Sequence, residues 1–222
     1  MHTAATSPKS RQRAPSERAV ATHAKILDAA ELVFSANGFD GSTLRDIAAL
    51  AQVRVSLVHH HGGSKEALFA ETVARRAGEI ATARIAELAA SRAHGPLTVE
   101  VVFSAFFRPF LDRAASDPRW RAYARLVAQV SADDRWKAIT AAHFDPTAHR
   151  FLDELATLAP DSHRDAVATG FVYAVSAMLA HLTSQWRVGA LSKGAPGSGD
   201  ATARLVTFCA SGFRAAAGLP QP

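Results

Sequence analysis

Apolar residues recur at helical spacing along most of this 222-residue chain, and this pattern constrains its fold more than any other feature. Ile26, Leu27, Ala30, Val33 and Phe34, for example, fall on one face of a helix. Few stretches alternate Val, Ile, Thr and aromatic residues with polar ones, so strand signals are weak. The sequence therefore predicts an all-α protein of about nine helices.

Capping and breaking residues divide these helices. Asn37-Gly38 ends the first, and Thr43 with Asp46 forms a capping arrangement before a short helix over 44–51. Pro109 is expected to kink a helix over 97–115. Further helices are expected over 64–90, 117–132, 134–158 (broken near 145), 161–188 and 200–217, with a mobile loop over 189–199.

Two short helices joined by a tight turn are expected between Leu44 and Lys65, after the long first helix. Three helices in this order form a helix-turn-helix, in which the last helix enters the major groove of DNA. The sequence thus predicts a DNA-binding domain over 16–65 and a larger helical domain over 66–222. Residues 1–15, which are polar and basic, are expected to form a disordered arm that suits a polyanion or serves as a solubilising tail.

The stretch from Ile26 to Phe69 resembles the N-terminal domain of the TetR family of transcriptional regulators. Its ILDAA helix, the Gly-Phe pair at 38–39, the TLRDIA segment at 43–48 and the GSKE run at 63–66 follow the family pattern. The resemblance implies a cytoplasmic homodimer that binds double-stranded DNA, usually as a repressor, and that a small ligand releases. It implies no cofactor.

Position and side-chain chemistry select the candidate DNA contacts. Arg54, Val55 and Ser56 open the second short helix, where arginine can pair with guanine and valine can contact a thymine methyl. The resemblance implies that the following histidines reach bases or phosphates and that Lys65 binds a phosphate at the next helix N-terminus. The full predicted set is Thr43, Arg45, Arg54, Val55, Ser56, His59, His60, His61 and Lys65.

Three consecutive histidines also suggest a metal site. Neighbouring side chains on a helix diverge by about 100°, so His59, His60 and His61 cannot converge on one ion. Cys209 is the only cysteine, so no cysteine cluster can complete a site and no intrachain disulfide can form. We therefore expect no metal and a reducing, cytoplasmic compartment. The sequence contains no run of about 18 apolar residues, so it predicts no membrane span.

Two positions depart from the family pattern. Gln52 stands where the family usually has Gly, so it is expected to adopt a less common backbone conformation at a cost of about 1 kcal/mol. Gly62 replaces a Phe that anchors the recognition helix, and its absence is expected to loosen that helix. These departures leave open a ligand-binding dimer with weakened or lost DNA binding. A helical enzyme is the more distant alternative, because no motif for catalysis supports it.

Aromatic residues crowd the predicted C-terminal domain, where they pack as a core or line an apolar cavity for a small hydrophobic effector. Three segments, FFRPFL, WRAYARLVAQV and HFDPTAHRFL, resemble regulators of fatty-acid metabolism within the family, which implies an acyl chain or another hydrophobic acid, such as an aromatic one. The candidate lining residues are Phe103, Phe107, Phe110, Trp120, Tyr123, Phe144, Phe171 and Met178. Polar groups for the same cavity are His143, His149, His181 and Gln185.

Small and apolar residues in the last two helices predict a dimer interface, because small side chains let helices approach closely. Two such helices from each subunit would form a four-helix contact. Two recognition helices about 34 Å apart would then match a near-palindromic operator. The predicted interface residues are Gly170, Ala174, Ala177, Leu205, Phe208 and Gly212.

Overall fold

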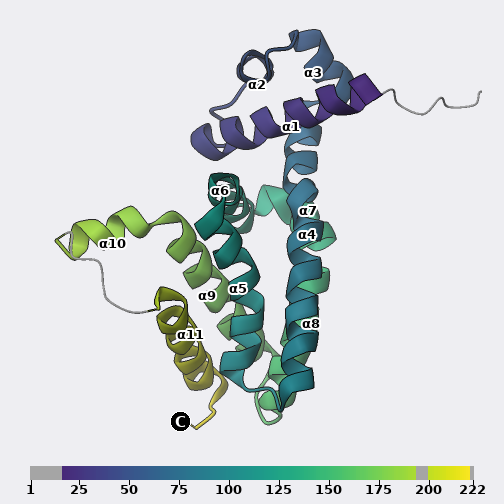
Figure 1. The fold of residues 1–222 in the computed structure, drawn as a ribbon. Coiled ribbons are helices and arrows are strands. Elements are labelled where there is room, and N and C mark those ends of the chain that lie inside the picture. Colours follow the sequence, from purple (N-terminus) through teal and green to yellow (C-terminus); the bar gives the residue numbers. More distant parts are fainter. Residues whose placement is uncertain (1–16, 194–199, 221–222) are drawn as a thin grey trace, which may run out of the picture.

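A computed structural model of the chain describes residues 17–193 and 200–220, so the predicted basic arm lies outside the described residues. Figure 1 shows a three-helix head at one end of a larger helical body, with one long helix running from the head along the body. The predicted all-α class is confirmed. The described residues form eleven α-helices and one 3-10 turn, which is more than the nine expected.

The head consists of α1 (Glu17–Asn37), α2 (Leu44–Ala51) and α3 (Val55–Gly62), and α4 (Lys65–His94) connects it to the body. The body contains α5 (Val99–Ser116), α6 (Pro118–Ala132), the 3-10 turn η1 (Asp134–Trp136), α7 (Lys137–His143), α8 (Asp145–Leu158), α9 (Arg164–Thr183), α10 (Gln185–Leu191) and α11 (Ala201–Ala217).

The helix starts are local and follow the capping residues. The Thr43 hydroxyl accepts a hydrogen bond from the Asp46 amide at 3.2 Å, and the Asp46 carboxylate accepts one from the Thr43 amide at 2.9 Å. Ser64 caps α4 by accepting from the Ala67 amide, and Asp117 caps α6 ahead of Pro118. These side chains satisfy amides that a helix N-terminus otherwise leaves unpaired.

One predicted boundary in the body is wrong, whereas the break expected near residue 145 is confirmed between α7 and α8. The helix expected over 161–188 breaks at Ser184, so α10 is a separate short helix that extends to Leu191, into the expected loop. The region 134–158 divides into η1, α7 and α8. α5 runs through Pro109 as one continuous element. The rest of the expected loop, at 194–199, lies outside the described residues.

Within the described residues, α9 is the one helix whose length and composition would allow it to cross a membrane, although it contains no uninterrupted apolar run of the length sought in the sequence. Core helices of soluble proteins meet the same criterion. α9 packs against α6, α8 and α11 within the body, and these contacts bury part of its apolar surface.

Candidate DNA interface

The head holds α3 in place through a core that all three of its helices and α4 share. Ile26 and Phe34 of α1, Ile47 of α2, Val58 of α3 and Phe69 of α4 have no exposed surface. The core fixes the position of α3 because close-packed side chains resist small displacements.

The junction between α3 and α4 is also filled, which contradicts the expectation that Gly62 leaves it loose. Gly62 is buried, and a Cβ added to it would lie 2.9 Å from Cδ1 and 3.2 Å from Cβ of Leu68. Leu68 thus occupies the space beside Gly62, and there is no room there for a larger side chain.

The turn between α2 and α3 is a left-handed cap. Gln52 has φ 56° and ψ 43°, the conformation that was expected to be costly for a residue other than Gly. The amide of Val53 donates to the Ala48 carbonyl at 3.0 Å and closes the turn. This turn sets the angle at which α3 leaves α2.

Several of the predicted DNA contacts are exposed around α2 and α3. α3 begins at Val55, one residue later than expected, so Arg54 is its N-cap residue. The Arg54 side chain makes no capping hydrogen bond. Within the described part of the chain, neither Arg45 nor Arg54 has a carboxylate at ion-pair distance. The exposed members of the predicted set are Thr43, Arg45, Arg54, Ser56, His59 and His60.

The other three predicted contacts lie against protein. Val55 is half-buried and packs on the head core. The ring of His61 stacks on that of His23, with centroids 5.5 Å apart and planes at 13°. The Lys65 ammonium lies 4.4 Å from the centroid of the Phe39 ring, a cation–π contact.

The His23–His61 contact was not anticipated, because His23 belongs to no recognisable motif. Burial, with the charges of His23 and His60, lowers the pKa of His61. His23 Nε2 lies 3.0 Å from Glu71 Oε1 without the alignment of a hydrogen bond. His61 is therefore better placed to join α3 to α1 than to contact DNA, whereas His59 and His60 remain outside. Leu57, 38% exposed on the same helix, is a further candidate contact that the sequence analysis missed.

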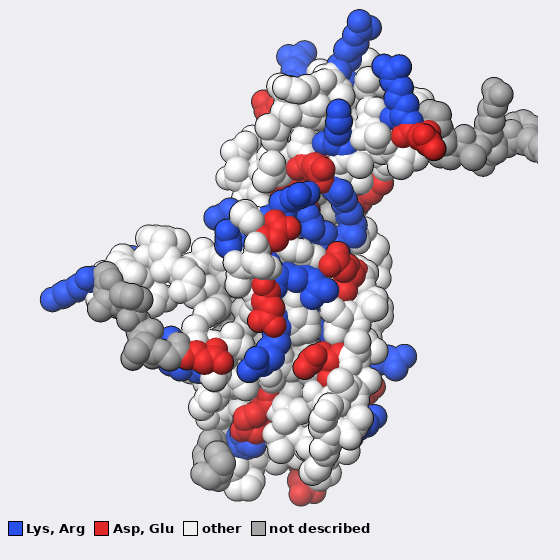
Figure 2. Space-filling view, in the orientation of Figure 1, with Lys and Arg blue, Asp and Glu red and all other residues white. Residues whose placement is uncertain are grey.

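Charge is distributed so that the outer end of the head is basic. Figure 2 shows Lys and Arg side chains projecting from that end, whereas acidic and basic groups alternate along the middle of the molecule. Three acidic residues of the head, Asp28, Glu31 and Asp40, pair with arginines of the body. Around α2 and α3, Arg45 and Arg54 are exposed beside one carboxylate, Asp46, which is engaged in capping α2. Exposed guanidinium groups of this kind can bind phosphates.

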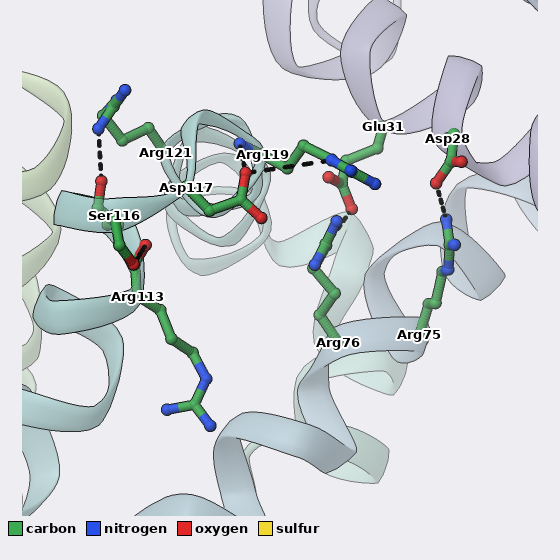
Figure 3. Close-up of polar contacts among 10 residues, drawn as sticks. Asp28, Glu31, Arg75, Arg76, Arg113, Ser116, Asp117, Arg119 and Arg121 are labelled. Carbon is green, nitrogen blue, oxygen red and sulfur yellow. Dashed lines mark hydrogen bonds and ion pairs between the residues drawn. The ribbon is translucent and has the colours of Figure 1, made fainter.

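Ion pairs hold the head against the body. Figure 3 shows Arg75 reaching Asp28 and Arg76 reaching Glu31, both at 2.6 Å. The Arg76–Glu31 pair is buried, with 13% and 2% of the side chains exposed. Burial lowers the pKa of Arg76, but the hydrogen bond to Glu31 and nearby carboxylates outweigh it and raise the pKa overall. These two pairs connect α4 directly to α1.

In the body, the predicted effector residues pack as core. All but Phe144, which is half-buried, are at most 5% exposed, and none of the eight lines a described cavity. Phe103 stacks on Phe107 with centroids 5.5 Å apart, and Phe110 contacts Trp120 at 5.8 Å. Of the two interpretations that the sequence left open, core packing is therefore the one that these contacts support.

A cavity of about 360 Å³ lies beside this core. Leu111 and Ala114 of α5 and His181 and Leu182 of α9 line it, together with Gln185 and the start of α11. His181 and Gln185, two of the four predicted polar residues, thus lie at one site. His143 and His149 lie elsewhere. A second cavity, of about 280 Å³, lies between the loop after α1 and η1.

The predicted dimer residues divide into two groups. Gly170, Ala174 and Leu205 are buried where α9 packs on α11 within one chain, and a Cβ on Gly170 would lie 2.8 Å from the Phe213 ring. Phe208, by contrast, is 71% exposed, and Gly212 faces open space. Gly170 and Ala174 therefore serve contacts within the subunit, Ala177 is half-buried against the core, and the outer surface of α9 and α11 near Phe208 and Gly212 is exposed.

These features define an all-helical protein with a helix-turn-helix head on a larger helical body. The family model for bacterial regulatory proteins of the tetR family matches residues 26–72, and the tetracyclin repressor-like C-terminal domain matches residues 104–212. The chain belongs to the TetR family of transcriptional regulators.

Solved structures show the same fold. A TetR-like transcriptional regulator from Rhodococcus sp. RHA1 is 20% identical, with a TM-score of 0.58 over 93% of this chain and 100% of the other. HlyIIR, a hemolysin II transcriptional regulator, is 16% identical, with a TM-score of 0.55 over 86% of this chain and 97% of the other. No curated protein sequence matches the chain significantly.

Proposed function

We propose that the protein is a cytoplasmic, ligand-responsive repressor that binds a near-palindromic operator as a homodimer. One observation carries the proposal: a closely packed helix-turn-helix exposes Arg45 of α2 and Arg54 before α3, with no carboxylate partner among the described residues. Unpaired guanidinium groups at such a position can contact phosphates and guanine edges.

The dimer forms, we infer, through the outer face of α9 and α11. Val172, Tyr173 and Phe208 expose 57%, 68% and 71% of their surface there, which is unusual for large apolar side chains that face water. Gly212, one turn after Phe208, leaves room for a partner helix. Two copies of this face would bury one another around a twofold axis.

Release from DNA would follow from a ligand that binds the body. The 360 Å³ cavity beside α5 and α9 is within the size range of small-molecule sites. A ligand that favours one position of α4 would shift the spacing of the two heads, because ion pairs connect α4 to α1.

DNA binding is tested by a gel shift with fragments from upstream of the protein's own gene, at several salt concentrations. Wild type should bind one fragment, with an affinity that falls steeply as salt rises. Arg54→Ala and Arg45→Ala should each weaken binding about tenfold, whereas Arg150→Ala, an exposed residue on α8, should not. If wild type binds no fragment, the ligand-binding dimer without DNA binding is the correct alternative.

The dimer is tested by measuring molar mass in solution. Phe208→Asp should shift the protein to monomer, since it places a charge at the centre of the apolar face. Leu32→Asp, at an exposed apolar position on α1, is the matched control and should leave the mass unchanged. A Phe208→Asp protein that remains dimeric would contradict the proposed interface.

A further inference from the structure

Arg84 is an arginine enclosed in the aromatic core of the body. Only 6% of the residue is exposed. Its Nε donates to the Phe106 carbonyl at 2.8 Å, and its Nη2 lies 3.7 Å from the Met178 sulfur. The guanidinium carbon lies 3.6 Å from the centroid of the Phe106 ring and 5.8 Å from that of Phe110.

No carboxylate accompanies this buried charge within the part of the chain that the structure describes. The other enclosed arginines do have a carboxylate partner: Arg76 pairs with Glu31, and Arg214 pairs with Glu100. Burial lowers the pKa of Arg84 to about 9, so the side chain still carries its charge at neutral pH. A buried charge without a counterion is costly, and proteins usually pair it.

We propose that Arg84 binds the carboxylate of the effector, which is a small apolar monocarboxylate whose hydrocarbon part extends into the cavity beside α5 and α9. This inference rests on the proposed function, since it names the class of ligand to which the regulator responds. A carboxylate would supply the missing counterion and could form two parallel hydrogen bonds with the guanidinium.

The described cavity adjoins the two helices whose side chains enclose Arg84, α5 and α9. Leu182, which lines the cavity, follows Met178 by four residues and so lies one turn further along α9. Leu111 of the cavity wall is adjacent in sequence to Phe110, whose ring faces the guanidinium. Two walls of the cavity are thus continuous with the segments that enclose the buried charge, and Asp112, Arg121 and Asp200 also line it.

Met178 is the side chain that must move. It is buried, and its thioether is a weak acceptor for Arg84 Nη2. Methionine side chains are flexible and adapt to new neighbours more readily than the aromatic rings around them. A ligand carboxylate in place of the Met178 sulfur would exchange a weak contact for a charged hydrogen bond.

The test is a thermal-shift titration of the full-length protein with matched acids and alcohols. Octanoate and 4-phenylbutyrate are the carboxylate probes, and 1-octanol and 4-phenyl-1-butanol are the same skeletons without charge. At pH 7.5 a carboxylate should raise the Tm of wild type by several degrees, and its matched alcohol should not. Equal shifts for acid and alcohol, or no shift with any probe, would overturn the proposal.

Two substitutions locate the effect. Arg84→Met should abolish the carboxylate shift, whereas Arg92→Met, an exposed arginine on the same helix, should preserve it. A full shift in Arg84→Met would refute the assignment. If that variant does not fold, Arg84→Lys keeps the charge without the two-pronged geometry, and the apparent Kd for the carboxylate should rise at least tenfold. An unchanged Kd would refute the assignment equally.

DNA binding separates this inference from the proposed function. The gel shift without any probe should be the same for wild type and Arg84→Met, because Arg84 lies far from α3. If wild type binds DNA but is stabilised by no carboxylate, only the inference about Arg84 is refuted. If wild type is stabilised by carboxylates but binds no DNA, the ligand site is supported and the proposed repressor function is refuted.

Discussion

Replacing Glu31 by Gln should destabilise the protein more than any other single change of charge at the junction between head and body. The substitution keeps the shape of the side chain but removes the negative charge beside Arg76, which is 2.6 Å away. The remaining carboxylates near Arg76 are Asp117 and Glu79, which act on it only at a distance.

The magnitude follows from burial. Only 2% of the Glu31 side chain and 13% of the Arg76 side chain are exposed, so solvent cannot replace the lost partner. Breaking a buried pair costs about 3–5 kcal/mol, and we take about 3 kcal/mol because Gln can still accept one hydrogen bond. For a chain of this length, that loss lowers the Tm by roughly 6–12 °C.

The assay is thermal unfolding at one fixed protein concentration, because a dimer unfolds at a temperature that depends on concentration. Asp28→Asn is the matched control: it lies one turn earlier on α1 and breaks the Arg75 pair, in which 31% and 44% of the side chains are exposed. That change should cost about 0.5 kcal/mol, roughly 1–2 °C. If the two variants melt within about 2 °C of each other, burial does not determine the strength of these pairs.

Three further changes test local features. Gln52→Gly should raise the free energy of unfolding by about 0.5–1 kcal/mol, because it relieves a left-handed residue, and an unchanged Tm would contradict this. Gly62→Phe should lower the stability by about 1–3 kcal/mol through overlap with Leu68 and weaken DNA binding, and adding Leu68→Ala should restore part of both; tighter binding by the single variant would refute the packing. The Arg214 hydrogen bond holds the pKa of Glu100 at about 2, below the ordinary 4.5, so this pair stabilises the fold above pH 4.5 and is lost as the pH falls toward 2. Because 38% of the Glu100 side chain is exposed, the effect should be about 1 kcal/mol, and Glu100→Gln should remove that part of the acid sensitivity of Tm between pH 5 and 3.

The features that the sequence predicted well are those in which residues a few positions apart determine the structure. The Thr43–Asp46 capping box depends only on local chemistry and is present, and the left-handed turn at Gln52, which the family resemblance implied, is present as well. The break at Ser184 was missed because no Gly or Pro marks it. Neither Val55 nor His61 could be oriented, because a helix of eight residues offers a periodic pattern too short to define its buried face.

Longer-range features were predicted less well. The periodicity of α5 identified its aromatic side chains but could not distinguish a core from a cavity, since both place the same residues inside. Gly170 and Ala174 pack within one chain rather than between two, a choice that depends on α11 and not on their own helix. Arg84 reads as a surface residue in the sequence, because burial without a counterion shows only in three dimensions.

The position of Arg84 on α4 gives the proposed ligand site a direct mechanical connection to the head. Arg76 precedes Arg84 by eight residues, about 12 Å along the helix, and its pair with Glu31 is the most buried of the described ion pairs between body and head. Since α4 is one continuous helix from Lys65 to His94, a displacement that a ligand imposes at Arg84 cannot be absorbed by a loop before it reaches α1. Coupling of this kind is reciprocal: a ligand that weakens DNA binding through α4 must itself bind less tightly to the DNA-bound form, and by the same factor.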